Sequence, residues 1–585
     1  MFRQSKIKSY LLVGCLYFSL ALVFTYPLVV NFGGKLVGAD DANSHLWMGW
    51  WFHRALFVEH KNPLAWNNYL FYPDGFRLGS SYDGLIFPIF SLITKPFIGN
   101  QLAGYNLFCL LALSFSAWSV FVLVNSLVGS GAISFLAGLA VGFSPYQMAH
   151  LIGGHSNLIL LGFVPLFLWR FLKQVHRPSN ANLLSASLLL FLVGVGSWNY
   201  LLFTLLSLGA FLGGVYLANY RGKFDRFCSW ITSIRIYFLL VIGGCLLLPL
   251  ILPIVQGYFG GEVVTPVGSS YLFGSADLTS YFFPPPQSNL GRIFSTAGVY
   301  QKYFIFNQAE ATTFLGWAEV ILVAWLLLRK GWSRVAGKLW LGLASVAFLL
   351  SLGAKLYIFG RAYIPLPYLL LVRLPLGGLV RVPSRLSIFV LLFLVIFISL
   401  NTAAYFRKLK SWSKAVVWTL LFLGLVGVRL YLPFRMLEEY ESPFYYQLRQ
   451  DREAYVVANL PSFDAADTNV VANYSQTIHE KKMVGGYIST FSLTTRVGRF
   501  IIENPALYHS FCLSFNPEKA SEIQTDQPLD RLFKVLSENN IRYLIVHKYL
   551  LARPECDFYK VFIEDYLRQK PVYFEDGYLR VYRTD

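Results

Sequence analysis

The chain is poor in charged residues. Of its 585 residues, 14% are Asp, Glu, Lys or Arg and 55% are hydrophobic, whereas about a quarter of an ordinary soluble domain is charged. So small a charged fraction excludes a soluble globular protein. The apolar residues gather in repeated runs of about 17–22, the length at which a helix crosses the ~30 Å hydrocarbon core of a bilayer. The sequence therefore predicts a polytopic α-helical membrane protein.

Cysteine is scarce, and nucleotide-binding motifs are missing. The six cysteines form no CxxC pair and no His/Cys set with zinc-site spacing. No Walker A sequence, GxSxG elbow or dinucleotide-binding glycine pattern occurs, so we expect no nucleotide cofactor. Cys512 and Cys556 lie in the C-terminal region. The sequence leaves open whether a disulfide bond joins them.

Acidic residues are rare in the first three quarters of the chain. Residues 1–434 hold 31 Lys and Arg but ten Asp and Glu, whereas residues 435–585 hold 18 and 21. The net charge of +18 therefore belongs to the membrane part, where basic residues set orientation and contact anionic lipid. We do not expect a nucleic-acid partner.

About eleven apolar stretches are long enough to be membrane-spanning helices. They are roughly 9–30, 102–124, 131–148, 156–173, 182–198, 201–219, 235–255, 312–329, 336–353, 384–404 and 413–433. Lys and Arg cluster in alternate short loops, which predicts a cytoplasmic N-terminus and an extracytoplasmic C-terminal region in a bacterial cytoplasmic (inner) membrane. The first run lacks a small-x-small cleavage site, so we interpret it as a retained span and not as a signal peptide.

The chain divides into a membrane part, 1–434, and a more polar part, 435–585. Three outer loops of the membrane part, about 31–101, 256–311 and 354–383, are long enough to build a site. The C-terminal part has short β-like runs at 455–460, 542–547 and 578–583 and a helical stretch at 527–540. It predicts a small α/β extracytoplasmic domain docked on the outer face.

An acidic pair, Asp40-Asp41, lies in the first outer loop just before an aromatic stretch. At helical spacing, Trp47, Trp50 and Arg54 predict an amphipathic helix at the membrane interface, with Asp at its N-cap. The pair either caps this helix or acts chemically. In the second case a carboxylate deprotonates an acceptor hydroxyl or binds a divalent cation beside a phosphate.

An acidic pair in the first outer loop, an interfacial helix, many spans and a soluble outer domain together resemble the GT-C superfamily of polyprenyl-phosphate-sugar-dependent glycosyltransferases. Local strings look like those of uncharacterised bacterial glycosyltransferase-like membrane proteins; they are Ser144–His150, His155–Asn157, Asp277–Pro286, Glu310–Gly316 and Arg381–Arg385. The resemblance implies sugar transfer from a polyprenyl-phosphate donor to a cell-envelope glycan, lipid or protein acceptor, with inversion. It implies Asp40 or Asp41 as the base, with Asp40 slightly preferred.

Sugar transfer from a lipid phosphate releases a phosphate anion, which a cation must stabilise. Arg373, Arg381 and Arg385 lie in the last outer loop and at the start of the following span. A guanidinium binds phosphate through two parallel hydrogen bonds. The alternative is that these arginines extend to phospholipid headgroups.

Several further residues are candidates for substrate binding. His150 and His155 flank a short outer turn, where they are either ordinary interfacial histidines or bind a metal, position a phosphate or orient a sugar. The sequence shows no third ligand for a metal. Glu310 begins a span and Asp277 precedes a proline run, with helix-start and loop-scaffold roles as alternatives. Trp47 and Trp50 are candidates for sugar stacking. A divalent cation such as Mg²⁺ or Mn²⁺ is left open.

Two other function classes stay open. A transporter or flippase for a lipid-linked substrate has internal repeats and polar residues near the middle of its spans. We find no convincing repeat, and Glu319 is the one acid placed inside a predicted span. A non-catalytic scaffold for cell-envelope assembly retains the same architecture without activity. It differs from the enzyme in whether Asp40 or Asp41 shares a site with an arginine.

Overall fold

The computed structural model describes residues 2–39, 41–81, 83–260, 274–304, 307–329, 335–373, 382–460, 466–487, 529–549 and 567–584, with Phe500 and Leu551. Asp40, Arg381, Cys512 and Cys556 lie outside these residues. What was expected of them stays a prediction.

Among the residues that the structure describes, eight helical segments are long and apolar enough to cross a membrane. They are Ile7–Phe24, Gln101–Val128, Gly131–Ile152, Ser156–His176, Trp198–Tyr220, Ile236–Phe259, Pro383–Lys408 and Ser411–Val428. Three shorter apolar helical segments are Asn180–Gly196, Trp317–Leu328 and Gly337–Ser351. The prediction of a polytopic helical membrane protein is confirmed. All eleven segments overlap predicted spans, and the count of eleven stays a prediction because the last three are short for a bilayer.

Three of the described membrane segments are buried along most of their length: Gln101–Val128, Gly131–Ile152 and Pro383–Lys408. Helix α5 (Gln101–Val128) begins where the Asn100 side chain accepts a hydrogen bond from the Ala103 N–H (2.9 Å), and ends at Gly129 in a left-handed conformation. Helix α21 (Ser387–Lys408) is buried through its first three turns. The remaining long helices are α1 (Phe2–Phe24), α9 (Phe163–His176), α10 (Asn180–Gly196), α11 (Trp198–Val215), α13 (Ile236–Phe259), α18 (Trp317–Leu328), α19 (Val335–Ser351) and α22 (Ser411–Val428).

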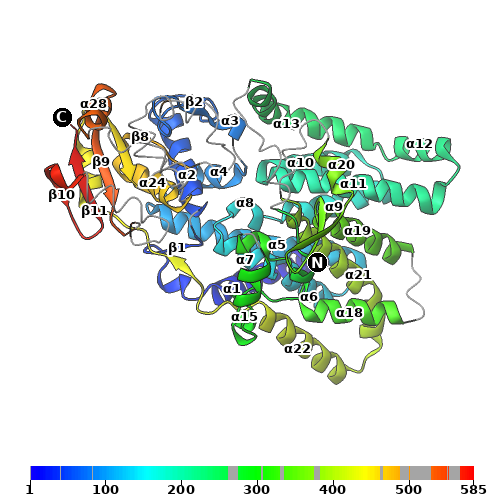
Figure 1. Cartoon of the computed structure of the whole chain (residues 1–585). Coiled ribbons are helices and arrows are strands. Elements are labelled where there is room, and N and C mark those ends of the chain that lie inside the picture. The colour runs from blue at the N-terminus through cyan, green and yellow to red at the C-terminus, as the bar shows by residue number, and fades with distance from the viewer. Residues whose placement is uncertain are drawn as a thin grey trace.

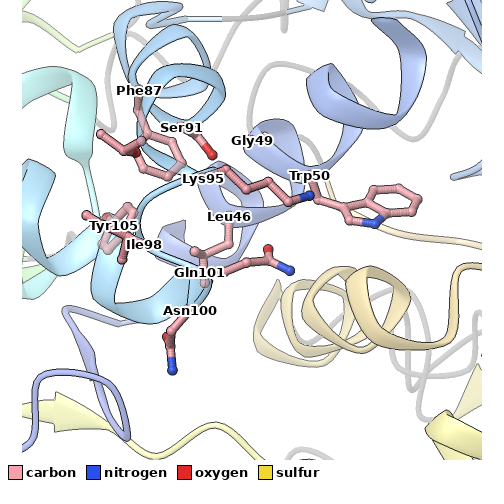
Figure 2. Close-up of a pocket in the computed structure, with 12 residues that line it drawn as sticks. Leu46, Gly49, Trp50, Phe87, Ser91, Lys95, Ile98, Asn100, Gln101 and Tyr105 are labelled. Carbon is pink, nitrogen blue, oxygen red and sulfur yellow. The ribbon is translucent and has the colours of Figure 1, made fainter. Parts of the chain in front are cut away.

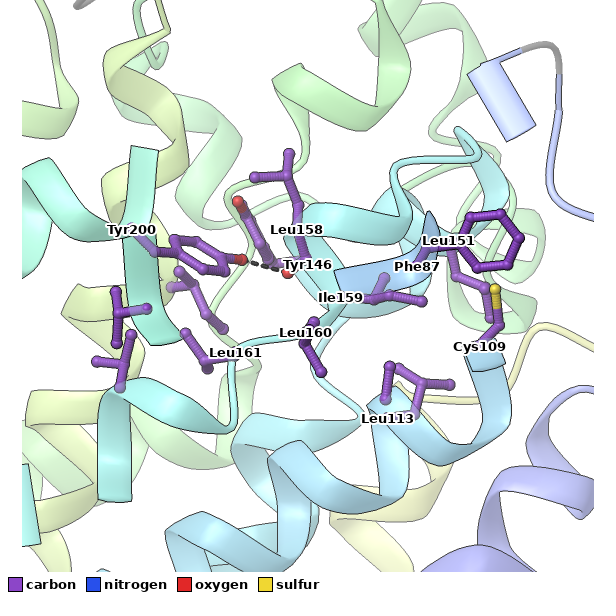
Figure 3. Packing of buried hydrophobic residues seen from close by; sticks show 14 of the residues in the cluster. Phe87, Cys109, Leu113, Tyr146, Leu151, Leu158, Ile159, Leu160, Leu161 and Tyr200 are labelled. Atoms are coloured by element: carbon purple, nitrogen blue, oxygen red, sulfur yellow. Dashed lines mark hydrogen bonds between the residues drawn. The ribbon is translucent and has the colours of Figure 1, made fainter. Parts of the chain in front are cut away.

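One membrane segment is broken near the outer loops. Helix α6 (Gly131–Gly142) stops, and α7 (Pro145–Ile152) starts anew because the Ser144 hydroxyl accepts from the Gln147 N–H and Pro145 fits the first helical turn. A short helix, α8 (Ser156–Ile159), follows. Apolar side chains such as Leu151, Leu158 and Leu161 anchor this turn in the core, and the Tyr200 hydroxyl donates to the Leu158 carbonyl (Figure 3).

The first outer loop is ordered by the helix that follows it. Asn106 of α5 accepts from the Val37 N–H (2.9 Å) and donates to the carbonyls of Phe32 and Lys35 (2.8 Å each). The elements of this loop are β1 (Leu36–Val37), α2 (Asp41–Phe57), β2 (Trp66–Asn67), β3 (Phe76–Arg77), α3 (Leu78–Ser81) and α4 (Ile86–Thr94). The later outer segments hold η3 (Leu278–Tyr281), α15 (Asn289–Ile293), α16 (Ala297–Tyr303), α17 (Gln308–Ala311), β4 (Lys355–Ile358), β5 (Arg361–Pro365), α20 (Tyr368–Val372) and η5 (Pro383–Leu386).

The C-terminal part contains a five-stranded sheet of order β10-β11-β9-β7-β8. Its strands are β7 (Val456–Leu460), β8 (Lys482–Val484), β9 (Ile541–His547), β10 (Val572–Glu575) and β11 (Leu579–Arg583), with helices α23 (Pro443–Gln450), α24 (Ala466–His479) and α28 (Leu529–Glu538). Strand β7 is parallel to β8 and β9, whereas β11 is antiparallel to β9 and β10. The three predicted strands and the predicted helical stretch are all present.

The first outer loop and the C-terminal part are joined by hydrogen bonds. Trp47 Nε1 donates to Gln476 Oε1 (2.6 Å), Arg54 pairs with Glu480 (2.6 Å), and the Phe71 N–H donates to the Gly485 carbonyl (2.8 Å). Helix α2 therefore forms as predicted and packs against α24. Because of these contacts, Trp47 is fully buried. The placement of α2 at the membrane interface stays a prediction.

The two ends of the molecule differ in structure. Figure 1 shows the C-terminal sheet and α2 at one end and α12 (Phe224–Ser233) at the opposite end. Arg221, Lys223 and Arg226 lie at the α12 end, as the predicted topology requires. The assignment of that end to the cytoplasm stays a prediction.

Candidate active site

Five candidate side chains, distant in sequence, form a continuous row. Asp41 Oδ2 lies 2.9 Å from His155 Nε2, and His155 Nδ1 lies 2.7 Å from His150 Nδ1. His150 Nε2 is 4.0 Å from Glu310 Oε2, and the Glu310 carboxylate accepts hydrogen bonds from Arg385 Nε (3.1 Å) and Nη2. The sequence nominated each residue separately, and the structure brings them together.

Each of these side chains comes from a helix end or a short turn. Asp41 is the first residue of α2, His150 lies near the end of α7, and His155 directly precedes α8. Glu310 is on α17, whose first turn is capped by Asn307, and Arg385 is in η5 at the outer end of a span. The row therefore lies where outer loops meet the membrane helices.

A glycine allows the histidine turn to reach α2. Gly154 has φ +77°, a left-handed conformation that side-chain-bearing residues rarely adopt, and a Cβ added there would lie 2.4 Å from the Ala42 nitrogen. The Tyr105 hydroxyl holds the same turn by donating to the Gly154 carbonyl (3.0 Å). This close approach puts His155 within hydrogen-bond distance of Asp41.

The environment keeps both carboxylates ionised. Burial raises the pKa of Asp41, but the hydrogen bond and charge of His155, the charge of His45 and a hydrogen bond from the Tyr487 hydroxyl outweigh it and leave the pKa below its ordinary value. Burial likewise opposes ionisation of Glu310, but the charge of Arg385 and its hydrogen bond lower the pKa to about 2.

The pKa of Glu310 predicts an acid-dependent contribution to stability. Because the folded-state pKa is about 2 and the ordinary value is 4.5, the ionised carboxylate stabilises the folded protein above about pH 4.5, and this stabilisation is lost as the pH falls toward 2. The difference in Tm between the wild type and Glu310→Gln in detergent is therefore expected to shrink on acidification through this range. A difference that does not change with pH would contradict the assignment.

Two residues of the site were not singled out from the sequence. His45 lies one turn after Asp41 on α2 and is buried, which lowers its pKa to about 4. Tyr487 comes from the C-terminal part, where Asn473 holds its backbone through two hydrogen bonds of 2.7 and 3.1 Å. The i, i+4 spacing of Asp41 and His45 is a signal for the first. No local pattern points to Tyr487.

Asp83 was also not singled out from the sequence, and its hydrogen bonds hold together segments next to the row. Its carboxylate accepts from Asn157 Nδ2 (2.8 Å), from the Trp198 N–H (2.8 Å) and from Asn199 Nδ2 (3.0 Å). It thereby ties the first outer loop to the turn after His155 and to the start of α11.

The other candidates lie apart from the row. Asp277 caps η3 and accepts from the Gly360 N–H (2.8 Å), which is the loop-scaffold arrangement. Arg373 is exposed just after α20. Trp47 and Trp50 are buried on α2. Proposed contacts of these residues with substrate stay predictions.

Glu319, the acid inside a predicted span, forms an ion pair. Its Oε1 lies 2.5 Å from Arg429 Nη2, and both side chains are nearly inaccessible to solvent. Arg429 also donates to the carbonyls of Ala140 (2.8 Å) and Leu425 (2.9 Å). The one acid placed inside a predicted span is therefore paired with a buried arginine.

No known family model matches the sequence, and no curated protein sequence matches it at a significant level. Solved structures do match the chain. Arabinofuranosyltransferase AftD from Mycobacteria aligns with a TM-score of 0.53 and 13% identity over 99% of this chain and 41% of that one. The Archaeoglobus fulgidus oligosaccharyltransferase, in complex with Zn and sulfate, aligns with a TM-score of 0.52 and 10% identity over 96% and 70% of the two chains.

The likeness runs along nearly the whole chain, although this chain spans less than half of the AftD chain. At identities of 10–13% it shows the fold and not the substrate. The chain has the fold of the GT-C glycosyltransferases that its sequence resembles.

Proposed function

We propose that this protein is an integral membrane glycosyltransferase that moves a sugar from a polyprenyl-phosphate donor to a cell-envelope acceptor on the outer face of a bacterial inner membrane. One observation carries the proposal. The carboxylate of Asp41 lies in a row with His155, His150, Glu310 and Arg385, at the junction of the outer loops and the membrane helices. The GT-C fold supports it.

Asp41 is the general base of the proposed reaction. About a quarter of its side chain is exposed (26%), so an acceptor hydroxyl can reach it, and its lowered pKa keeps it ionised. The hydroxyl oxygen attacks the anomeric carbon of the sugar, its proton passes to Asp41, and the bond from that carbon to the lipid phosphate breaks. Attack from the face opposite the phosphate inverts the anomeric centre.

The departing phosphate needs positive charge. Glu310 occupies Nε and Nη2 of Arg385, which leaves the Nη1 side of the guanidinium for a phosphate oxygen. Because the polyprenyl chain costs ~0.8 kcal/mol per CH₂ to move into water, the donor enters from the bilayer. Arg385 lies at the outer start of a span, where it can meet the phosphate of a donor that enters from the bilayer.

The row has the composition of a metal site. His150, His155 and Glu310 each offer one ligand atom, and these atoms lie within 4.8 Å of one another. His150 Nε2 is buried and has no hydrogen-bond partner among the described residues. Imidazoles and carboxylates are ligands of Zn²⁺ and Mn²⁺, so the residues fit a divalent cation. Such an ion would stabilise negative charge on the lipid phosphate.

Removing one imidazole is expected to weaken metal binding. We expect His150→Ala to lower the affinity for Zn²⁺ or Mn²⁺ at least about tenfold, because a buried ligand is lost. Isothermal titration of the purified, metal-stripped protein in detergent measures this affinity. His53→Ala, on the same α2 helix as Asp41 but outside the row, is the control. Equal affinities of the wild type and His150→Ala would contradict the metal site.

The function is tested by transfer of radiolabelled sugar from a panel of polyprenyl-phosphate sugars in membranes that contain the wild type or Asp41→Asn at equal expression. Transfer that depends on Asp41 supports the proposal.

The transporter alternative is weakened by the ion pair of Glu319 with Arg429, because Glu319, the acid inside a predicted span, is already paired within the protein. The scaffold alternative requires that the row has no catalytic use, and transfer activity that depends on Asp41 would exclude it.

A further inference from the structure

A pocket separate from the row lies between α2, α4 and the start of α5. The hollow spans about 360 Å³ of space between side chains, a volume that includes open solvent, and it is open to the surface. Six of its lining residues are Leu46, Trp50, Ser91, Lys95, Gln101 and Tyr105. Figure 2 shows the Lys95 side chain extending across the pocket toward Trp50. A cation, an amide, a hydroxyl and an aromatic ring therefore line one hollow, a combination that suits a small polar ligand.

Lys95 supplies a positive charge that the protein does not neutralise. No carboxylate of the described residues lies within salt-bridge distance of its ammonium group. Glu480, the acid that interacts with it electrostatically, is already paired with Arg54 (2.6 Å) and Arg449 (3.2 Å). A half-buried, unpaired ammonium is a binding group for an anion.

The sequence predicts that the pocket lies at the boundary between the first outer loop, about 31–101, and the span that follows it. It is built on the first turn of α5, a membrane-spanning helix. On and just after α4, Ile89, Ile93 and Phe97 expose 41%, 64% and 86% of their surface. Apolar side chains this exposed beside a span are typical of contact with acyl chains.

The pocket and the row share a wall. Tyr105 lines the pocket, and its hydroxyl donates to the carbonyl of Gly154, the residue before His155. A headgroup held beside Lys95 would thus be next to the turn that carries the histidines, whereas Arg385 lies at the other end of the row, beyond Glu310.

We infer that this pocket binds the anionic headgroup of a membrane lipid and that the acceptor is such a lipid. The inference rests on the proposed function, which it extends by naming the acceptor class. Lys95 binds the phosphate of the headgroup, Gln101 and Ser91 contact its hydroxyls, and the acyl chains run past Ile93 and Phe97. Donor and acceptor then approach the row from different sides.

The test is lipid binding to the full-length protein in detergent, with short-chain phosphatidylglycerol and phosphatidylcholine as probes. We expect Lys95→Met, which keeps the apolar stem, to weaken phosphatidylglycerol binding about tenfold and to leave phosphatidylcholine binding unchanged, because one charge-assisted contact is lost. Lys95→Arg is expected to retain binding. Lys302→Ala, an exposed lysine on α16, is the matched control.

Two results would overturn the inference. One is equal phosphatidylglycerol affinity in the wild type and Lys95→Met. The other is competition by inorganic phosphate as strong as that by phosphatidylglycerol, which would identify a soluble anion as the ligand. Asp41→Asn is expected to bind phosphatidylglycerol normally. The lipid site and the transferase proposal therefore fail independently, since the first is read by binding and the second by transfer.

Discussion

Replacing Asp41 with asparagine is expected to lower the rate of sugar transfer by about 10²–10⁴-fold, the usual contribution of a general base. Asparagine has nearly the same shape and still accepts a hydrogen bond from His155, so the site keeps its geometry. It cannot take a proton from the acceptor hydroxyl. The effect should therefore appear in kcat, with little change in the KM of the donor.

Asp40→Asn is the matched control, because it removes the same charge from the neighbouring residue. We expect it to reduce transfer much less, since the structure assigns to Asp41 the contact with His155. The sequence resemblance slightly favoured Asp40. A large loss in Asp40→Asn with a small loss in Asp41→Asn would therefore assign the base to Asp40 and contradict the role proposed here for Asp41.

Breaking the Glu319–Arg429 pair is expected to destabilise the protein by about 3–5 kcal/mol, because it leaves an unpaired charge in a water-free interior. Glu319→Leu removes the carboxylate at similar volume. Arg429 is then left with the carbonyls of Ala140 and Leu425 as its hydrogen-bond acceptors. Unfolding of the purified protein in mixed micelles of rising denaturing detergent measures the change.

Two further variants make this result specific. The double variant Glu319→Leu/Arg429→Met replaces both charges with apolar groups and is expected to recover most of the lost stability. Glu438→Gln breaks the exposed pair with Lys35 and should change stability by less than about 1 kcal/mol. If Glu319→Leu is as stable as the wild type, the ion pair does not hold α18 and α22 together. A transport role for Glu319 would then deserve renewed testing.

The sequence by itself determined the properties that depend on local pattern. Runs of apolar residues fix membrane-spanning helices because each helix satisfies its own backbone hydrogen bonds in lipid. Short β-like runs at 455–460, 542–547 and 578–583 predicted the strands that the structure has at 456–460, 541–547 and 579–583. Acidic residues are scarce in the membrane part, with ten in 434 residues, so each could be considered singly. Asp41, Glu310 and Glu319 became candidates in this way.

Only the tertiary structure decided which of these residues meet. Glu310 lies 155 positions after His155, yet it lies next to His150, and the close approach at Gly154 brings His155 to Asp41. Tyr487 reaches the same carboxylate from the C-terminal part, and Gln476 buries Trp47 across 429 positions. Such contacts depend on how helices and sheet pack, which the local spacing of residues does not encode. The row from Asp41 to Arg385 could therefore be assembled only from the folded chain.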